Sequence, residues 1–389
     1  MTDNNENKVL NVPHLRFPEF SGEWEEHTLS EYLEFKNGLN PDAKRIGSGL
    51  PFISVMDILN NQFICYDNIR ASVEVVDGDI ETYGVNYGDI LFQRSSETLE
   101  DVGQANVYLD SKPAVFGGFV IRGKSKSNYY PMFFRYLLAS PTARKKIIVK
   151  GAGAQHFNIG QDGLSKVCLN IPSIQEQEKI AKLFECIDTR IATQNKIIED
   201  LKKLKSAISL KMLHSDSWEQ FKIQDIASIG RGRVISSVEI SQQENPLYPV
   251  YSSQTSNDGI MGYLDDFMFE GEYISWTTDG ANAGTVFYRN GKFNCTNVCG
   301  LLKLKKGFDA HFVSLVLAEA TRMYVSTNLA NPKLMNNTMG NIQIRLPKLE
   351  EQKRISVVFR KLHGLLETHN SLIIKYSKQK QYLLSQMFI

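Results

Sequence analysis

The stretch Ile171-Pro-Ser-Ile-Gln-Glu-Gln-Glu-Lys-Ile180 decides how this chain is organised, because it occurs twice. Its counterpart is Leu346-Pro-Lys-Leu-Glu-Glu-Gln-Lys-Arg-Ile355, which lies 175 residues further along. The same spacing holds without a gap as far as Met212 and Met387. A sequence that repeats at a fixed spacing predicts a fold built from equivalent structural units.

A second repeated element opens each half of the chain. Trp24-Glu-Glu-His-Thr-Leu29 is similar to Trp218-Glu-Gln-Phe-Lys-Ile223, and Gly38 corresponds to Gly232. Here the spacing is 194 residues, so the middle of the first half is 19 residues longer than the middle of the second. We therefore predict two halves that share their ends and diverge in their middles.

Each half ends in a long amphipathic helix. Apolar residues recur there at steps of three and four, which is typical of a coiled-coil seam. The seam residues are Ile180, Phe184, Ile187, Ile191, Ile198, Leu201 and Ile208 in the first helix, and Ile355, Phe359, Leu362, Leu366, Ile373, Tyr376 and Leu383 in the second. A helix of about 40 residues is ~60 Å long, and so long an apolar seam needs a partner. We predict that the two helices pack on each other as an antiparallel coiled coil with pseudo-twofold symmetry.

Two lysines, Lys205 and Lys380, interrupt the seams at equivalent positions. Either such polar seam positions fix the register and the partner of the helices at a cost in stability, or their aliphatic stems lie along the edge of the seam while their ammonium groups reach water.

The middles have the pattern of mixed α/β structure. Strands are predicted at 51–55, 89–92, 114–116 and 119–121 in the first and at 248–251, 272–276 and 285–288 in the second, with short helices at 132–140 and 310–320. The fold class is therefore two tandem α/β (α+β) domains, each followed by a long helix. The predicted parts are an N-terminal segment 1–16, a first domain 17–173, helix 174–213, a second domain 214–348 and helix 349–389.

Composition excludes several classes of protein. The 389 residues are 42% hydrophobic and 22% charged, which argues against a disordered or fibrous protein. The net charge of +1 argues against a strongly basic, free-standing nucleic-acid protein. The polar start lacks a signal-peptide core and no apolar run is long enough to span a bilayer, so we expect no membrane contact and a cytoplasmic location.

Motifs for catalysis and metal binding are missing from the sequence. There is no Gly-x-x-x-x-Gly-Lys-Ser/Thr phosphate loop, no Gly-x-Ser-x-Gly elbow and no Asn/Asp-Pro-Pro-aromatic motif of an amino-methyltransferase. Cys295 and Cys299 lie near His311, but a fourth zinc ligand is not evident, so we expect free thiols and no metal. The sequence gives no positive reason to expect an enzyme.

The repeat, the Trp openings and the repeated helix starts together resemble the specificity subunit of Type I restriction-modification systems. Supporting stretches are Leu15-Arg-Phe-Pro-Glu-Phe-Ser-Gly-Glu-Trp24, Gly88-Asp-Ile-Leu-Phe92 and Tyr248-Pro-Val-Tyr-Ser-Ser-Gln254. The resemblance covers nearly the whole chain, and its strength lies in the order of these motifs.

The resemblance implies a non-catalytic adaptor that binds double-stranded DNA. Each middle would be a target recognition domain that reads one half of a bipartite, asymmetric site, and the helices would set the gap between the halves. Two methyltransferase subunits, which bind S-adenosylmethionine and methylate adenine at N6, would dock on the helices. ATP-dependent motor-nuclease subunits would complete the restricting complex. No cofactor is expected on this chain, because S-adenosylmethionine, ATP and Mg would belong to the partner subunits.

Candidate DNA contacts are loop positions after strand-like runs or Gly-rich turns, with side chains that suit phosphates or base edges. They are Lys44, Arg45, Gln93, Arg94, Ser95, Ser96, Gln155, His156 and Asn158 in the first domain, and Arg231, Arg233, Ser253, Gln254, Thr277, Thr278, Asn282, Lys333 and Asn336 in the second. The alternative for each is an ordinary solvated loop residue. We expect Trp24 and Trp218 to be core anchors, whereas Trp276 suits either a core or a contact.

Two other functions fit parts of the sequence. A non-catalytic coiled-coil scaffold with protein-binding heads would also need a long helical hairpin, but it would not bind DNA in a sequence-dependent manner. A nuclease or methyltransferase in its own right would need the motifs that are missing here.

Overall fold

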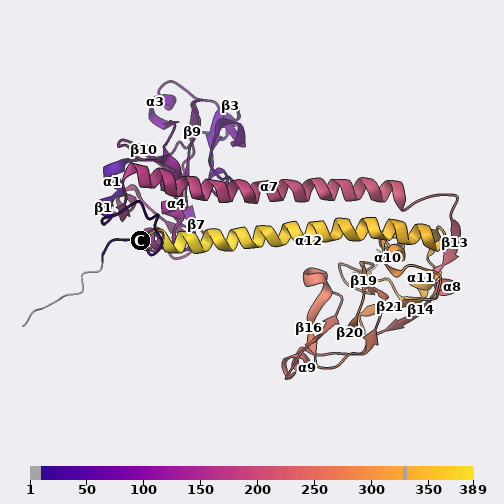
Figure 1. Ribbon diagram of the computed structural model, residues 1–389. Coiled ribbons are helices and arrows are strands. Elements are labelled where there is room, and N and C mark those ends of the chain that lie inside the picture. The colour runs from indigo at the N-terminus through magenta and orange to yellow at the C-terminus, as the bar shows by residue number, and fades with distance from the viewer. Residues whose placement is uncertain (1–9, 327–330) are drawn as a thin grey trace, which may run out of the picture. The chain divides into compact units, whose positions relative to one another are not determined.

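The computed structural model describes residues 10–326 and 331–389, which fall into two compact units (Figure 1). The first unit comprises the chain up to Asn195 together with Ser371–Ile389, and the second comprises Lys196–Asn370. Each unit contains one globular head and a part of each of the two long helices, α7 (Ile174–Met212) and α12 (Leu349–Gln386). The compact units therefore do not follow the linear order of the predicted domains.

The two long helices begin at the residues where the repeat predicts them and run antiparallel. In the first unit the start of α7, with Ile180 and Phe184, shares a core cluster with the end of α12, including Leu383. In the second unit the relation is reversed, because Phe359 near the start of α12 packs in one cluster with Ile208 near the end of α7. The predicted antiparallel pairing is thus present in both units (Figure 1).

The seam residues lie on the inner face of the helices. All fourteen are buried or half-buried, and Phe184 and Phe359 are among the largest fully buried side chains. At Lys380 the structure shows a contact between the two helices, because its ammonium group is 2.6 Å from Oδ1 of Asp188 on α7. The hydroxyl of Tyr136 donates to the other carboxylate oxygen of Asp188 at 2.9 Å, so a polar network ties both helices to the first head.

The two heads share one topology. The first contains the pair β1 (Glu25–Thr28)–β12 (Cys168–Ile171), the sheet β2 (Leu33–Asn37)–β10 (Val120–Ser125)–β6 (Ile90–Gln93)–β8 (Ala105–Val107) and the sheet β4 (Ala71–Val73)–β3 (Ile46–Ile53)–β9 (Ala114–Phe116)–β5 (Gly84–Val85). The second contains β13 (Glu219–Lys222)–β22 (Gln343–Leu346), β14 (Ala227–Arg231)–β21 (Cys299–Leu304)–β18 (Tyr273–Thr277)–β19 (Val286–Arg289) and β16 (Ile260–Leu264)–β15 (Tyr248–Tyr251)–β20 (Lys292–Cys295)–β17 (Phe269–Glu270). In each head one pair is parallel, β3 with β9 and β15 with β20, and the other pairs of these sheets are antiparallel. The middles therefore diverge in sequence while keeping the same strand order.

Helices occupy equivalent places as well. The pairs are α1 (Leu29–Tyr32) and α8 (Ile223–Ile226), α4 (Pro131–Ala139) and α10 (Ala310–Ala320), and α6 (Gln161–Ser165) and α11 (Asn336–Asn341). The remaining elements are α2 (Val55–Asn60), α3 (Asp79–Tyr83), α5 (Pro141–Ile148), α9 (Ser237–Ser241), the short strands β7 (Ser95–Ser96) and β11 (Phe157–Asn158), and the 3-10 turns η1 (Ala43–Arg45), η2 (Tyr66–Asn68), η3 (Ser256–Gly259) and η4 (Thr321–Met323). Each predicted strand and short helix overlaps an observed one.

The equivalent glycines occur where two backbones come into contact. A β-carbon on Gly38 would lie 2.0 Å from the carbonyl oxygen of Gly117, and one on Gly232 would lie 1.6 Å from that of Cys295. Since no side chain fits there, the repeated glycine is required where the chain that leaves β2, or β14 in the second head, meets the backbone at the end of β9, or β20.

The tryptophans differ in burial. Trp24 is 2% exposed and lies edge-on to Phe133 and Phe388, so it anchors the first core as predicted. Trp276 is fully buried, with its indole N–H donating to the carbonyl of Leu334 at 2.9 Å, which settles it as a core residue. Trp218, the counterpart of Trp24, is only half-buried.

The glutamine of the repeated Glu-Gln motif connects the start of each long helix to a helix of the head. Gln177 is 3% exposed; its amide donates to the carbonyl of Pro172 at 2.9 Å and its oxygen accepts from the amide of Tyr130 at 3.0 Å. Gln352 does the same with Pro347 at 2.8 Å and with Asp309 at 3.0 Å. Tyr130 and Asp309 are the N-caps of α4 and α10, so the motif fixes two helix starts at once.

Replacing Gln177 by leucine should lower the free energy of unfolding by about 2–3 kcal/mol. The substitution leaves a buried carbonyl and a buried amide without partners, and each such group costs about 1–3 kcal/mol. Urea unfolding followed by circular dichroism measures the loss. The exposed Gln175, two residues earlier on the same helix, provides a matched control, because Gln175→Leu should change stability by less than about 0.5 kcal/mol. Equal losses in the two variants would contradict the role given to Gln177.

His311 on α10 is a half-buried histidine of the second unit. Its Nδ1 lies 2.8 Å from the hydroxyl of Ser356, and its ring meets Tyr288 edge-on. Burial, followed by the nearby charge of Arg360, lowers the pKa of His311 from 6.5 to about 4. The charges of Asp309, His363 and Lys205 also act on the ring.

The pKa of His311 predicts a loss of stability as the pH falls from 6.5 towards 4. In that window the unfolded imidazole binds a proton that the folded one does not, so acid favours unfolding, and the effect levels off below pH 4. Because the ring is only partly buried, we expect about 1–2 kcal/mol after allowing for solvent screening. Urea midpoints measured across this window should depend less on pH in His311→Gln. The exposed His156→Gln should keep the wild-type slope, and an unchanged slope in His311→Gln would refute the assignment.

Candidate nucleic-acid interface

In the first head the structure joins two of the predicted loops. Strands β7 and β11 pair antiparallel, with Ser95 opposite Asn158 and the hydroxyl of Ser95 donating to the Asn158 amide oxygen. Arg94 precedes β7, and its guanidinium donates to the carbonyl of Gly118 at 3.3 Å. The loop before β11 holds the exposed Gln155 and His156. We call these half-buried to exposed residues, Arg94, Ser95, Gln155, His156 and Asn158, the ridge of the first head. The ridge presents one guanidinium, a hydroxyl, an imidazole and amides, which are groups suited to phosphates and base edges.

Other predicted residues of the first head lie elsewhere or are covered. Gln93 is 5% exposed, and its amide donates to the carbonyl of Ser95 at 2.9 Å, so it supports the ridge rather than extending from it. Arg45 forms an ion pair with Asp79 and donates to the carbonyl of Glu74 at 2.9 Å. Of the predicted pair on η1, Lys44 alone remains exposed. Direct DNA contacts from Gln93 and Arg45 stay a prediction, although both side chains already have partners within the head.

In the second head the central predicted pair is Arg231 and Asn336. The Nε of Arg231, at the end of β14, donates to the side-chain oxygen of Asn336 at 2.9 Å, at the start of α11. A further guanidinium nitrogen of Arg231 lies 3.4 Å from the carbonyl of Asn297. Lys333 is exposed on the adjoining segment, where its backbone forms isolated antiparallel β-bridges with Asp279 and Ser326. A cation and an amide thus meet from parts of the chain 105 residues apart.

The predicted threonines of the second head are buried. Thr277 is 1% exposed and Thr278 is 2% exposed. The hydroxyl of Thr277 donates to the carbonyl of Asn282, and that of Thr278 donates to the carbonyl of Val298 at 2.9 Å. These bonds hold the loop that carries the exposed Asn282. The contact of the two threonines with DNA stays a prediction, although both hydroxyls already donate within the head.

Two further predicted residues of the second head, Arg233 and Gln254, have hydrogen-bond partners within that head. Arg233 is paired with Glu239 on α9, and this hydrogen bond is the main cause of a lowered pKa at Glu239. Ser253 and Gln254 are half-buried in the loop between β15 and β16, where the Gln254 amide donates to the carbonyl of Ile260. Arg233 therefore has its charge compensated within the head.

Two residues next to these sites were not predicted. Phe119 is 70% exposed, and its carbonyl accepts from the amide of Arg94 at 2.9 Å. Asn297 lies beside Arg231 at the corresponding turn of the second head, two residues before β21 begins. The position of a bulky aromatic residue directly after Gly117-Gly118 could have indicated that Phe119 is exposed at a turn. For Asn297 the sequence contains no such indication beyond its place in a turn.

The comparisons with known proteins agree with this architecture. The family described as Type I restriction modification DNA specificity domain matches residues 21–203 and 215–375, so the chain belongs to this family. A Mycoplasma pneumoniae protein provisionally named a type I specificity subunit is 35% identical over 233 residues, which are 58% of this chain and 97% of that protein. The type I restriction enzyme MpnII specificity subunit of the same organism is 41% identical over 177 residues, 44% of this chain and 53% of that protein.

Solved structures share the fold. The crystal structure of a Type-I restriction-modification system S subunit from M. genitalium matches 97% of this chain and 99% of its own, with a TM-score of 0.67 and 15% identity. A chain from a study of complex assembly in the type I R-M system matches with a TM-score of 0.56 and 12% identity, over 93% of this chain and 96% of its own. In the part of this chain that the structure describes, none of the helices could cross a membrane.

Proposed function

We propose that this chain is the sequence-specific DNA-recognition subunit of a type I restriction-modification system. One observation supports the proposal above all: two heads of the same topology, in a chain that matches the specificity-domain family twice, carry different side chains at equivalent turns. The same frame with different contact residues is what the reading of two different half-sites requires, because base-edge recognition depends on the few side chains that reach a groove.

The predicted parts of the chain keep their proposed roles. Residues 17–173 and 214–348 are the recognition domains, and 174–213 and 349–389 are the spacer helices; of the N-terminal segment 1–16, residues 1–9 lie outside the described part. The ridge around Arg94 and Asn158 would meet one half-site, and the cluster around Arg231 and Asn336 would meet the other. Arginine pairs well with the edge of guanine and asparagine with that of adenine.

The partners and cofactors belong to the same proposal. Two methyltransferase subunits would dock on the helices, motor-nuclease subunits would complete the complex, and S-adenosylmethionine, ATP and Mg would be bound by those partners. Residues 14–173 hold 16 basic and 19 acidic residues, and residues 215–348 hold 12 and 13. Because affinity for DNA depends on the neutralisation of phosphates, heads of this charge should bind DNA weakly alone and need partners to enclose it.

The test is a genome-wide map of N6-methyladenine in a host that lacks its own modification, with this chain expressed beside its methyltransferase. A split motif that appears only when both chains are present is the expected result. If both proteins fold and co-purify but no new motif appears, the scaffold with protein-binding heads becomes the better account.

Within the assembled complex, Arg231→Ala should weaken binding to the DNA site by about 10- to 100-fold, which corresponds to the ~1–3 kcal/mol of a good base contact. Fluorescence anisotropy at fixed salt measures the affinities for the site and for unrelated DNA. Loss confined to the site indicates a base contact, whereas equal loss on both DNAs with a shallower salt dependence indicates a phosphate contact. Lys306→Ala is the control, because Lys306 is exposed beyond the far end of β21. An unchanged affinity in Arg231→Ala would remove this residue from the interface.

A further inference from the structure

In the first unit a segment of the chain itself lies in a hollow beside Trp24, where a pocket of about 300 Å³ remains. Arg16 donates to both carboxylate oxygens of Glu176, at 2.8 and 2.7 Å, and Glu176 is 1% exposed. Lys179, one turn further along α7, lies 4.8 Å from the centre of the Phe17 ring and forms an ion pair with Glu19. The start of α7 therefore holds three side chains from four consecutive residues: the guanidinium of Arg16, the ring of Phe17 and the carboxylate of Glu19.

The same segment also contacts the last turn of α12 and the opening tryptophan. The amide of Leu15 donates to the carbonyl of Gln386 at 2.9 Å. The amide of Trp24 donates to the carbonyl of Asn11 at 2.7 Å. Four residues thus form the walls of the hollow: Trp24, Glu176, Lys179 and Gln386.

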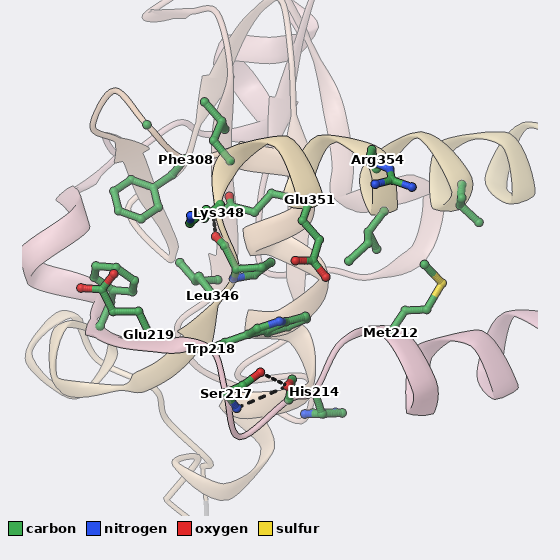
Figure 2. A pocket seen from close by; sticks show the side chains of 18 of the residues that line it. Met212, His214, Ser217, Trp218, Glu219, Phe308, Leu346, Lys348, Glu351 and Arg354 are labelled. Atoms are coloured by element: carbon green, nitrogen blue, oxygen red, sulfur yellow. Dashed lines mark hydrogen bonds between the residues drawn. The ribbon is translucent and has the colours of Figure 1, made fainter.

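The second unit contains the same walls without the segment between them. Their counterparts, by the spacings of the two repeats, are Trp218, Glu351, Arg354 and Lys211. All four line one pocket of about 1110 Å³, which lies wholly within the second unit (Figure 2). Figure 2 shows the carboxylate of Glu351 on the side of the pocket where Trp218 and Met212 lie.

Burial differs between the two places in the way that an empty site predicts. Glu176 and Trp24 are buried under the segment, whereas Glu351 is exposed and Trp218 is half-buried. The chain between α7 and Trp218 is residues 213–217, which is too short to fold back as residues 10–23 do, and it forms part of the pocket wall instead. Among residues 10–326 and 331–389, no segment occupies this place.

The lining defines the chemistry of the occupant. Glu351 would accept hydrogen bonds from a guanidinium, as Glu176 does. Trp218, Phe308 and Val358 provide apolar surface for an aromatic ring, and Arg354 would pair with a carboxylate two residues beyond that ring. The sequence that satisfies these groups is arginine, aromatic, any residue, acidic.

We infer that this pocket is a docking site for an extended segment of a partner protein that carries arginine, an aromatic residue and an acidic residue in that order. The occupant is a partner rather than a second copy of this chain, because each copy keeps its own Arg16 on the buried Glu176. Withdrawing Arg16 would leave a nearly buried charge unpaired, which is costly. The inference concerns a protein contact and does not depend on DNA recognition.

A peptide of residues 10–23, acetylated and amidated at its ends, is the probe. Titrated calorimetrically into the full chain, it should bind at one saturable site, since the first unit is already occupied. Glu351→Gln should weaken binding about 10-fold or more, because a hydrogen bond to a charged group contributes about 1.5–3 kcal/mol. The matched control is Glu350→Gln, whose exposed carboxylate lies 3.9 Å from Lys353 and does not line the pocket. A peptide with alanine in place of Arg16 should lose affinity to a similar degree.

Several outcomes would overturn the inference. Absence of saturable binding by a folded chain would do so, as would equal effects of Glu350→Gln and Glu351→Gln. Binding that responds to Glu176→Gln but not to Glu351→Gln would show that the peptide exchanges with the segment of the first unit. Self-association of the chain in sedimentation, lost in Glu351→Gln, would identify a second copy as the occupant.

Discussion

Replacing Phe388 by alanine should lower the free energy of unfolding of the chain by about 3–5 kcal/mol, the range found for large aromatic side chains in cores. Phe388 is 2% exposed. Its ring centre lies 5.6 Å from that of Phe133, 5.8 Å from that of Phe184 and 6.4 Å from that of Trp24. The residue therefore joins the end of α12 to the first head and to the start of α7, and its loss leaves a cavity at the point where three parts of the chain meet.

Urea unfolding monitored by both circular dichroism and tryptophan fluorescence measures the effect of Phe388→Ala, with Trp24 reporting on the first core. Tyr382→Ala is the control, because Tyr382 is 58% exposed in the last turns of α12, just before Phe388, and its removal should cost less than about 0.5 kcal/mol. If the two variants lost equal stability, the end of α12 would not be part of the first core in solution.

Glu176→Ala should have an effect of similar size, confined to the segment before Trp24. The substitution removes both carboxylate oxygens that accept from the Arg16 guanidinium, whose side chain is 13% exposed, and leaves only the carbonyls of Ser21 and Gly22 within its own segment as acceptors. Breaking a buried ion pair by removing one partner costs about 3–5 kcal/mol, since the remaining charge stays desolvated. The segment should then detach from α7, because a free arginine is better solvated in water than in the vacated site.

Limited proteolysis detects this release. Trypsin should cleave after Arg16 at a rate at least roughly 100-fold higher in Glu176→Ala than in the wild type, the factor that corresponds to about 3 kcal/mol in the opening equilibrium. Glu178→Ala is the matched control. Glu178 lies two residues beyond Glu176 on α7 and forms only an exposed ion pair with Lys182. Equal cleavage rates in the two variants would show that Glu176 does not hold the segment.

The features that the sequence revealed are those set by local spacing. Steps of three and four residues place Ile180 and Phe184 on one face of a helix whatever else surrounds them, so the seams and the helix starts could be predicted. The strands were visible for the same reason. The repeat added the antiparallel pairing, because equivalent seams in one chain are natural partners.

Long-range pairing was beyond the reach of such patterns. The parallel contact of β3 with β9, and that of β15 with β20, joins strands separated by tens of residues whose side chains differ between the heads. The sequence therefore did not reveal that the two heads share one strand order, although the repeated segments at the ends of each half were recognised. Likewise, Glu176 and Glu351 look equivalent in sequence, and only the ion pair with Arg16, 160 residues away, distinguishes them.

The candidate DNA contacts show the same division. Arg231 and Asn336 were each suggested by residue type and turn context, but their pairing across 105 residues was not predictable. Conversely, Thr277 and Arg45 resembled exposed loop residues because their partners, the carbonyl of Asn282 and the carboxylate of Asp79, cannot be read from local pattern. A polar side chain in a loop can therefore stabilise the loop itself instead of contacting a ligand.

The contacts of this chain close into a ring, although its covalent backbone does not. Each head is flanked by the start of the helix that follows it and by the end of the other helix, and Leu15 is hydrogen-bonded to Gln386 in the last turn of α12. In topological terms the position of the chain ends is then arbitrary. A circular permutant that joined the end of α12 to the segment before Trp24, and that opened the chain within residues 213–217, would keep every contact described within either unit.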